Sequence, residues 1–290
     1  MRWWRRWHEG RAWRRRGVKA LVFLGVLLLT LYPKPWLIPT WLSRITHMDS
    51  VLEPGHPGLA DLELQVRRAL PAEATPQMAL DAVQRAVLKR IPYAWDWEVW
   101  GVVEYLPTVG ETLAAGREDC DGRAVVAASL LRRMGYEAWL VSDILHVWVE
   151  TPYGETMGPT GGAKTLSGRG APGEKTRVHL TLGLARNLAR GSAYGVAAFP
   201  LIRELIVLAA LVAVTLHPRV TAVRLVVALV LLGAALALVR AGGISAAMTG
   251  ESLWITALGF VAAIVGWCAL LGPKRARPGV EATGLSEPRP

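Results

Sequence analysis

Cysteine is scarce in this chain, whose 290 residues include only Cys120 and Cys268. Disulfide-stapled scaffolds and zinc sites built from closely spaced cysteine pairs need more thiols than this. Cys268 lies inside an apolar run that we expect in a membrane, whereas Cys120 lies in a polar region expected outside the cytoplasm. No bridge can join them in that topology, so the sequence predicts that Cys120 is an unpaired thiol.

Excess positive charge is absent from most of the chain, although the net charge is +10. Residues 45–195 carry 15 Lys or Arg and 18 Asp or Glu, whereas residues 1–19 carry eight basic residues and one Glu. A basic arm usually indicates nucleic-acid binding, but this arm runs directly into the segment ALVFLGVLLLTLY. We therefore interpret residues 1–19 as a cytoplasmic membrane flank and expect no nucleic-acid partner.

Apolar residues are in excess, at 52% of the chain with a mean hydropathy of +0.29. Four segments approach the roughly 20 residues that cross a lipid bilayer. They are residues 20–42, 199–216, 221–239 and 253–271. A buried hairpin of soluble helices is the alternative for the middle two, and it is disfavoured because their central parts have no polar face. The first segment lacks a small-x-small cleavage site after its apolar run, which indicates a signal anchor.

Basic residues beside these segments predict the orientation of the chain. Arg219 and Arg224 lie between the second and third segments, and Lys274 follows the fourth. The positive-inside rule places such residues in the cytoplasm, together with both termini. The sequence thus predicts three transmembrane helices over 199–271 and a cytoplasmic tail over 272–290, in a multi-pass protein of the cell inner (plasma) membrane.

The remaining polar part, residues 43–195, is then an extracytoplasmic domain. Arg203 and Glu204, just after it, are expected to lie at the membrane interface or to pair with each other. We regard this pair as the place where a membrane-protein partner would assemble with the C-terminal helices.

Local patterns predict three helices in the extracytoplasmic domain. An apolar stripe at helical spacing indicates a packing helix over 75–91; it consists of Met78, Ala82, Val83, Ala86 and Val87. Thr108 and Glu111 form a capping box for a short helix over 109–115. A third helix opens at its N-cap Asp119 and ends before Gly135, with Val126, Leu130 and Met134 facing inward and Arg132 and Arg133 outward.

After Gly135 the hydrophobic period changes from helix to strand. Residues 137–143, 146–152 and 155–160 read as three strands, and the sequence from residue 161 onward is glycine-rich and loop-like. A helix followed by antiparallel strands is typical of the α+β class. The predicted architecture is therefore an α+β core, a helix packed on an antiparallel sheet, plus about four transmembrane helices.

Cys120 is expected in the first turn of a helix, where unpaired amide groups and the helix dipole favour the nucleophilic thiolate. His146 begins a strand 26 residues downstream and could supply the base of a Cys–His pair. The structural alternatives are a small buried cysteine and a structural histidine. A metal site from Asp119, Cys120, Asp121 and His146 is weaker because the paired spacing of zinc ligands is missing.

The run GETLAAGREDCDGRAVVAASLLRRMGYEAWLVSDILHVWVE resembles the core of the transglutaminase-like superfamily, which has a papain-like fold. The resemblance is closest to bacterial transglutaminase-like cysteine proteinases, and the core would cover residues 76–160. It rests on the acidic residues flanking the cysteine, the Leu-Leu-Arg-x-x-Gly helix end and the His-x-Trp strand. It implies that Cys120 attacks an amide or acyl carbon and that His146 transfers the proton.

The chain departs from the family pattern at the residue that orients the histidine. Where the family commonly has Asp-Pro-Thr, this chain has Gly158-Pro159-Thr160. Asp143, Thr160 or a backbone carbonyl remain as substitutes, whereas Glu150 lies about 13 Å along an extended strand from His146. Glu118 also replaces the usual glycine two residues before Cys120.

Calcium binding by Asp119 and Asp121 is implied for some relatives, but the second acidic cluster is incomplete. We therefore expect no metal and no cofactor.

Two functions follow. The first is a membrane-anchored thiol enzyme, a cysteine protease (a hydrolase) or an acyltransferase, acting on a peptide or protein amide in the cell envelope or periplasm. The second is a catalytically impaired transglutaminase-like module that binds an envelope or peptide partner. The sequence leaves open whether water or an amine would be the acceptor.

Overall fold

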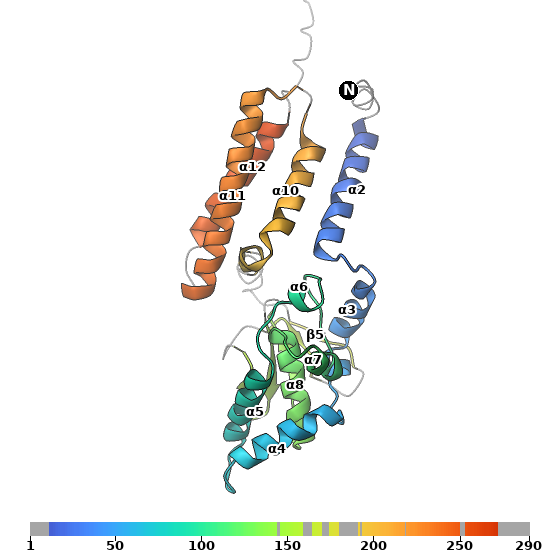
Figure 1. Cartoon of the computed structure of the whole chain (residues 1–290), viewed down its shortest axis with the longest axis vertical. Helices are drawn as coiled ribbons and strands as arrows, with labels where there is room; N and C mark the ends of the chain where they lie inside the picture. Colours follow the sequence, from blue (N-terminus) through green and yellow to red (C-terminus); the bar gives the residue numbers. More distant parts are fainter. Residues whose placement is uncertain are drawn as a thin grey trace, which may run out of the picture.

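The computed structural model describes most of the chain in two parts, a helical bundle and an α+β domain (Figure 1). The bundle consists of α2, α10, α11 and α12, and the domain lies at its lower end in the view of Figure 1. The described residues are 12–143, 146–158, 164–169, 174–179, 191, 193–217, 219–249 and 253–271. The arm 1–11 and the tail 272–290 lie outside them.

The bundle helices differ in length and polarity. Their bounds are α2 Ala12–Leu31, α10 Leu201–Thr215, α11 Ala222–Thr249 and α12 Leu253–Leu270. Among the described residues, one helix is both long and apolar enough to cross a membrane, namely α11 over Ala222–Ser245. The apolar part of α12, Trp254–Leu270, is shorter.

Of the four predicted membrane spans, the described residues support one, and the other three stay predictions. Helix α10 has only 15 residues, and α2 carries too much charge, with Arg14, Arg15, Arg16 and Lys19.

The predicted anchor 20–42 is divided between two helices. Helix α2 ends at Leu31, and α3 covers Leu37–Thr46 after a turn that contains Pro33 and Pro35. A proline removes a backbone donor and its ring clashes with the preceding turn of a helix, so α2 cannot continue through this stretch.

The domain helices match their local sequence signals. Their bounds are α4 Ala60–Ala69, α5 Pro76–Arg90, α6 Asp96–Val99, α7 Val109–Ala115 and α8 Cys120–Arg133, with short 3₁₀ turns at Met48–Val51 and Pro57–Leu59. The capping box at Thr108 is present, and Gly116 ends α7 with φ of 71°. The N-cap Asp119 accepts a hydrogen bond from the backbone N–H of Asp121. Since side-chain capping is local, these predictions are confirmed.

The sheet has five strands, all paired antiparallel, in the order β3-β2-β1-β4-β5. Strands β1 Trp139–Ser142 and β2 Val147–Thr151 fall within the first two predicted segments, whereas β3 Gly154–Thr156 begins before the third, 155–160, and overlaps it only at residues 155–156. Strands β4 Leu166–Ser167 and β5 Arg177–Val178 lie in the stretch predicted as loop, so that prediction was wrong there. Two-residue strands carry no periodicity, and only pairing orders them, β4 with β1 and β5 with β4.

Helix α8 is the centre of the domain. Ala124, Val126 and Leu130 are fully buried in one apolar cluster with residues of α4, α5 and β2. Met134 is half-buried, as expected for the end of this face.

Two predictions about side-chain directions were wrong. Arg132 and Arg133 are partly buried and form ion pairs with Asp49 and Glu63 respectively, rather than pointing outward. Met78, predicted in the apolar stripe of α5, is exposed. Both outcomes depend on the neighbours of the helix, which its own period does not reveal.

The bundle and the domain are joined by hydrogen bonds. The backbone N–H of Val103 donates to Leu31 O at 2.9 Å, and Lys34 Nζ donates to Trp100 O at 2.8 Å. Arg203 in α10 donates to Gly101 O at 3.1 Å. These bonds place the lower ends of α2 and α10 against the loop that precedes α7.

Candidate functional site

Cys120 lies in the first turn of α8, as predicted, and its side chain is half-buried. Its thiol donates a hydrogen bond to Asp121 Oδ1 at 3.3 Å. The backbone N–H of Val147, at the start of β2, also faces the sulfur. Helix α8 packs on β2, and this packing brings the cysteine to the beginning of that strand.

His146 immediately precedes β2. Its backbone N–H donates to Asp143 Oδ1 at 2.9 Å, and the N–H of Asp143 donates to His146 O at 3.2 Å. These two bonds close the turn between β1 and β2, whose residues 144–145 lie outside the described part. Cys120 and His146 line the same pocket. The structure therefore places the two predicted site residues around one cavity, from different elements.

This pocket has a volume of about 850 Å³ and extends from the α+β domain into the helical bundle. Its domain end is polar and includes Glu104, Asp119 and Asp121 beside the thiol and imidazole. Its bundle end is apolar. The apolar lining comes from four helices: Leu27 and Leu31 of α2, Val207, Leu208 and Leu211 of α10, Leu232, Ala235, Leu236 and Val239 of α11, and Phe260 and Ala263 of α12.

An aromatic wall connects the two ends of the pocket. The rings of Trp95 and Trp97 stack at 4.8 Å, and Tyr93 meets Trp95 edge-on at 5.1 Å. On the bundle side, Tyr194 lies 5.8 Å from Trp95 and Phe199 lies 5.6 Å from Trp97. Such rings bury large apolar areas in a fixed geometry, so the wall is a rigid side of the cavity.

No carboxylate can take the family position at Gly158 without a rearrangement. A Cβ atom there would lie 2.4 Å from Cβ of Trp148 and 2.8 Å from its Cγ, which is closer than real Cβ contacts. The following residues, Pro159 and Thr160, lie outside the described part. The glycine is therefore required by the packing of Trp148.

The other candidates for orienting His146 have different contacts. The Asp143 carboxylate accepts the backbone N–H of His146. Glu150 accepts from Trp139 Nε1 at 3.0 Å and pairs with Lys164 at 2.6 Å. Among the residues that share the pocket with His146, the carboxylates are Glu104, Asp119, Asp121 and Glu204.

Buried carboxylates gather behind the thiol. Glu118 is fully buried and accepts hydrogen bonds from Trp100 Nε1 and from the backbone N–H of Asp119. Burial and the neighbouring Asp119 raise the pKa of Glu118 to about 8. Burial also raises the pKa of Asp119 to about 6. Carboxyl groups this close cannot all be ionised cheaply in a low-dielectric site, so they share protons near neutral pH.

The same environment affects the thiol. Burial, followed by the charges of Asp121 and Asp119, raises the pKa of Cys120 well above its usual value. This direction is opposite to the one expected from the helix terminus alone. In the resting site the cysteine is therefore a neutral thiol hydrogen-bonded to Asp121.

Two groups of ligand atoms in this cluster are close enough to surround an ion. The first is Asp96, Glu118 and Asp119, and the second is Asp119, Cys120 and Asp121, each within 4.8 Å. Asp96 Oδ1 is buried and has no hydrogen-bond partner among the described residues. Carboxylate oxygens suit calcium, whereas the sulfur in the second group does not.

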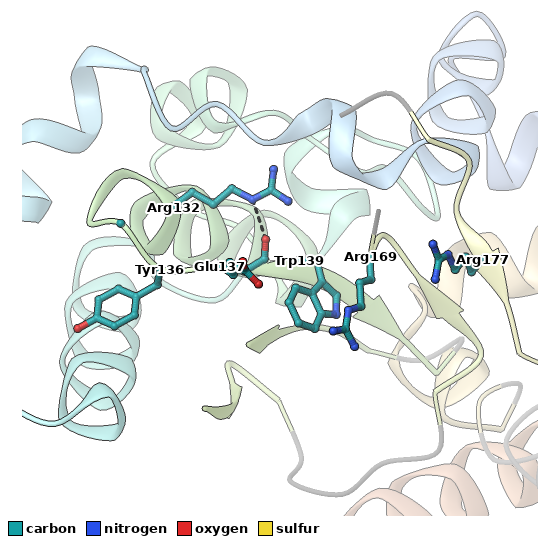
Figure 2. Close-up of a pocket in the computed structure, with 8 residues that line it drawn as sticks. Arg132, Tyr136, Glu137, Trp139, Arg169 and Arg177 are labelled. Carbon is teal, nitrogen blue, oxygen red and sulfur yellow. Dashed lines mark hydrogen bonds between the residues drawn. The ribbon is translucent and has the colours of Figure 1, made fainter. Parts of the chain in front are cut away.

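A second pocket of about 600 Å³ lies at the other end of α8 (Figure 2). It is lined by Arg132, Trp139, Arg169 and Arg177, and the Arg169 guanidinium lies 4.5 Å over the Trp139 ring. Fourteen helical residues place it roughly 20 Å from Cys120. Since its lining includes no cysteine or histidine, the first pocket is the candidate active site.

Sequence reasoning missed the aromatic wall and the bundle lining of this pocket. The segment IPYAWDWEVW is dense in aromatic residues, and this density was a readable signal for Tyr93, Trp95 and Trp97. The bundle residues gave no comparable signal, because an apolar helical residue can face lipid, a neighbouring helix or a cavity.

Comparison of the chain with protein-family models, with curated protein sequences and with solved structures gives no match in any of the three.

Proposed function

We propose that this chain is a membrane-anchored, transglutaminase-like thiol enzyme that acts on a peptide or protein amide outside the cytoplasm. The observation that carries the proposal is that Cys120, at the start of α8, and His146, before β2, line one pocket. A helix N-terminus packed against a sheet that supplies a histidine is the arrangement expected for a papain-like core over residues 76–160.

The reaction follows from these two groups. As the Cys120 sulfur attacks the amide carbon, its proton passes to His146, and the C–S bond forms while the C–N bond breaks. The imidazolium returns the proton to the leaving amine. Water or a second amine then attacks the thioester, His146 accepts its proton, and the thiol is restored with release of a carboxylate or a new amide.

Activation of the thiol has to occur when substrate binds, because the resting cysteine is protonated and bonded to Asp121. Rotation of the cysteine side chain toward His146 would exchange the carboxylate acceptor for an imidazole acceptor. Without a carboxylate at Gly158 the rate would be lower, as loss of the orienting Asp costs a serine-type triad about 10⁴ in kcat.

The membrane anchor is supported by apolar side chains that are exposed on all four bundle helices. Examples are Leu21 in α2, Ile202 in α10, Val230 in α11 and Val261 in α12. Soluble domains seldom expose such continuous apolar surfaces. We propose that α2, α10, α11 and α12 lie in the inner membrane as a multi-pass bundle, with the domain outside and both termini inside.

A second candidate function is a non-catalytic module that binds an envelope or peptide partner in the same pocket. Two observations favour it: the raised pKa of Cys120 and the packing that keeps a side chain out of position 158. Both would be natural in a domain that keeps the groove and has lost the chemistry.

Alkylation of Cys120 separates the two candidates. The full-length protein is treated with iodoacetamide across a pH series, with and without a peptide-amide library. Intact mass follows two products, the alkylated thiol formed by iodoacetamide and the acyl-thioester formed with the library. The enzyme proposal expects acyl-thioester adducts on Cys120 that are lost in His146→Ala. A cysteine that never forms a thioester, with labelling unchanged in His146→Ala, would support the binding module instead.

A further inference from the structure

The pocket that contains Cys120 does not end within the α+β domain. It continues upward between bundle helices, where its lining is almost entirely aliphatic or phenyl side chains. The lining residues of α10 run from Glu204 to Leu211 and those of α11 from Leu232 to Val239, about two helical turns or roughly 10 Å in each. A peptide groove on the domain alone would not need this depth.

The lining of the pocket divides into two chemically different ends. Cys120, His146 and the carboxylates lie at the domain end, and Leu208, Leu232 and Phe260 lie at the bundle end. The volume of about 850 Å³ is within the range of roughly 300–1,000 Å³ that is usual for small-molecule sites. A ligand that fills both ends must therefore join a reactive polar group to an apolar chain.

The charge at the polar end restricts the head of that ligand. Glu104, Asp119 and Asp121 face the pocket near the thiol. The described residues that line the pocket include no lysine or arginine, and nearby Arg123 donates to Ile91 O at 3.0 Å. An anionic head would add to the negative charge, whereas an uncharged amide or a cationic head would not.

Polar contacts of the bundle connect the elements that line the pocket. Glu204 lines the pocket and pairs with Arg240 of α11 at 2.5 Å. Arg240 also donates to the carbonyls of Val196 and Phe199. These bonds hold together α10, α11 and the segment that carries Tyr194 and Phe199 of the aromatic wall.

We propose that the pocket binds a long-chain amide, with an uncharged or cationic head at Cys120 and its hydrocarbon chain between α10, α11 and α12. As a substrate class, this is a lipid-modified amide rather than an unmodified peptide. The reactive role of the head rests on the proposed function, whereas the binding of the chain does not.

Photo-crosslinking tests the binding without the chemistry. The full chain carrying Cys120→Ser, in nanodiscs of neutral lipid, is exposed to N-methyldodecanamide with a diazirine at the end of the chain. Adducts are mapped by mass spectrometry. We expect them on pocket-lining residues such as Leu208, Leu211 and Leu232, and we expect the acetamide analogue with the same diazirine to give none.

A matched pair of variants controls for partition into lipid. Val207 lines the pocket, whereas its neighbour Ile206 is exposed on the outside of α10. Val207→Trp should reduce pocket adducts about tenfold or more, because excluding even two methylene groups from an apolar site changes affinity by roughly that factor. Ile206→Trp should leave the yield unchanged. If Val207→Trp does not fold, Ala263→Leu on α12 fills the same cavity with a smaller change.

Three results would overturn the proposal. The first is equal adduct yield in the Val207 and Ile206 variants, and the second is adducts only on outward residues such as Val230 and Val261. The third is labelling by the matching dodecanoate carboxylate that equals or exceeds that of the amide. Because Cys120→Ser lacks the proposed nucleophile, failure of the proposed catalysis would leave these results intact. Conversely, acyl-thioester formation with short peptides, without any pocket adducts, would support the proposed enzyme and contradict the long-chain ligand.

Discussion

The two parts of this molecule bury their apolar residues to very different extents. In the domain, the side chains of α8 from Ala124 to Leu131 are fully buried. In the bundle, α12 exposes Leu258, Phe260 and Val261 by more than half of their surface. Similar apolar composition thus has two meanings: in the domain it makes a closed core, and in the bundle it leaves a surface suited to hydrocarbon. The candidate site lies where these two environments meet.

The largest expected effect tests this contrast directly. Leu130→Ala should lower the free energy of unfolding of the domain by about 2–5 kcal/mol, because it leaves a cavity in a closed core. Val261→Ala should change it by less than about 0.5 kcal/mol, because the side chain is exposed. Urea unfolding of the full chain in detergent, followed by near-ultraviolet circular dichroism, measures both. Equal effects would mean that the bundle face is packed as tightly as the core.

A second prediction concerns Gly158, where the family resemblance and the packing disagree. Restoring the carboxylate with Gly158→Asp should destabilise the domain by about 1–3 kcal/mol, because the new side chain overlaps Trp148. Gly55→Asp is the control, since no atom lies within 4 Å of a Cβ at that exposed position. The thermal midpoints of the two variants are compared with that of the unmodified chain. A Gly158→Asp protein of unchanged midpoint and raised thiol activity would show that the strand accommodates the usual triad.

The smallest expected effect concerns the buried acids behind the thiol. Burial, followed by the charges of neighbouring carboxylates, raises the pKa of Asp96 well above its usual value. An acid whose pKa is raised on folding stabilises the protein at pH values below its unfolded pKa, near 4. That stability is lost as the pH rises through the folded pKa.

Asp96→Asn should remove this loss, because an amide can still accept the backbone N–H of Tyr105 and carries no charge. We expect the variant to be about 1 kcal/mol more stable than the unmodified chain at pH 8, and the two to converge near pH 4. Asp61→Asn, an exposed change, is the control. Unfolding curves at a series of pH values would contradict the idea if the difference were the same at every pH.

Local chemistry in the sequence was sufficient for most of the domain helices. Thr108 with Glu111, and Asp119 before Cys120, place helix starts through hydrogen bonds within three residues. Strands β1 and β2 were also predictable from the change of hydrophobic period after Gly135, and β3 overlaps the third predicted segment at residues 155–156. The short strands β4 and β5 were not, because their order comes from pairing with distant residues.

The candidate site was predictable only in its two reactive side chains. Cys120 and His146 could be proposed from residue type and position, and the structure places both on one pocket. The ion pairs of Arg132 and Arg133, and the clash that excludes a side chain at Gly158, involve partners far away in the sequence or across a turn.

By itself, the sequence determined the boundaries of α5, α7 and α8, the position of the thiol at a helix start and the concentration of apolar residues in the terminal segments. These depend on hydrogen bonds and periodicities that span a few residues. Only the tertiary structure decided that the thiol lines a cavity shared by residues from Leu27 to Ala263. It also decided that burial, followed by the charges of Asp121 and Asp119, raises the pKa of that thiol. The physical reason is that cavity shape and local dielectric depend on which surfaces, distant in the sequence, pack together and exclude water.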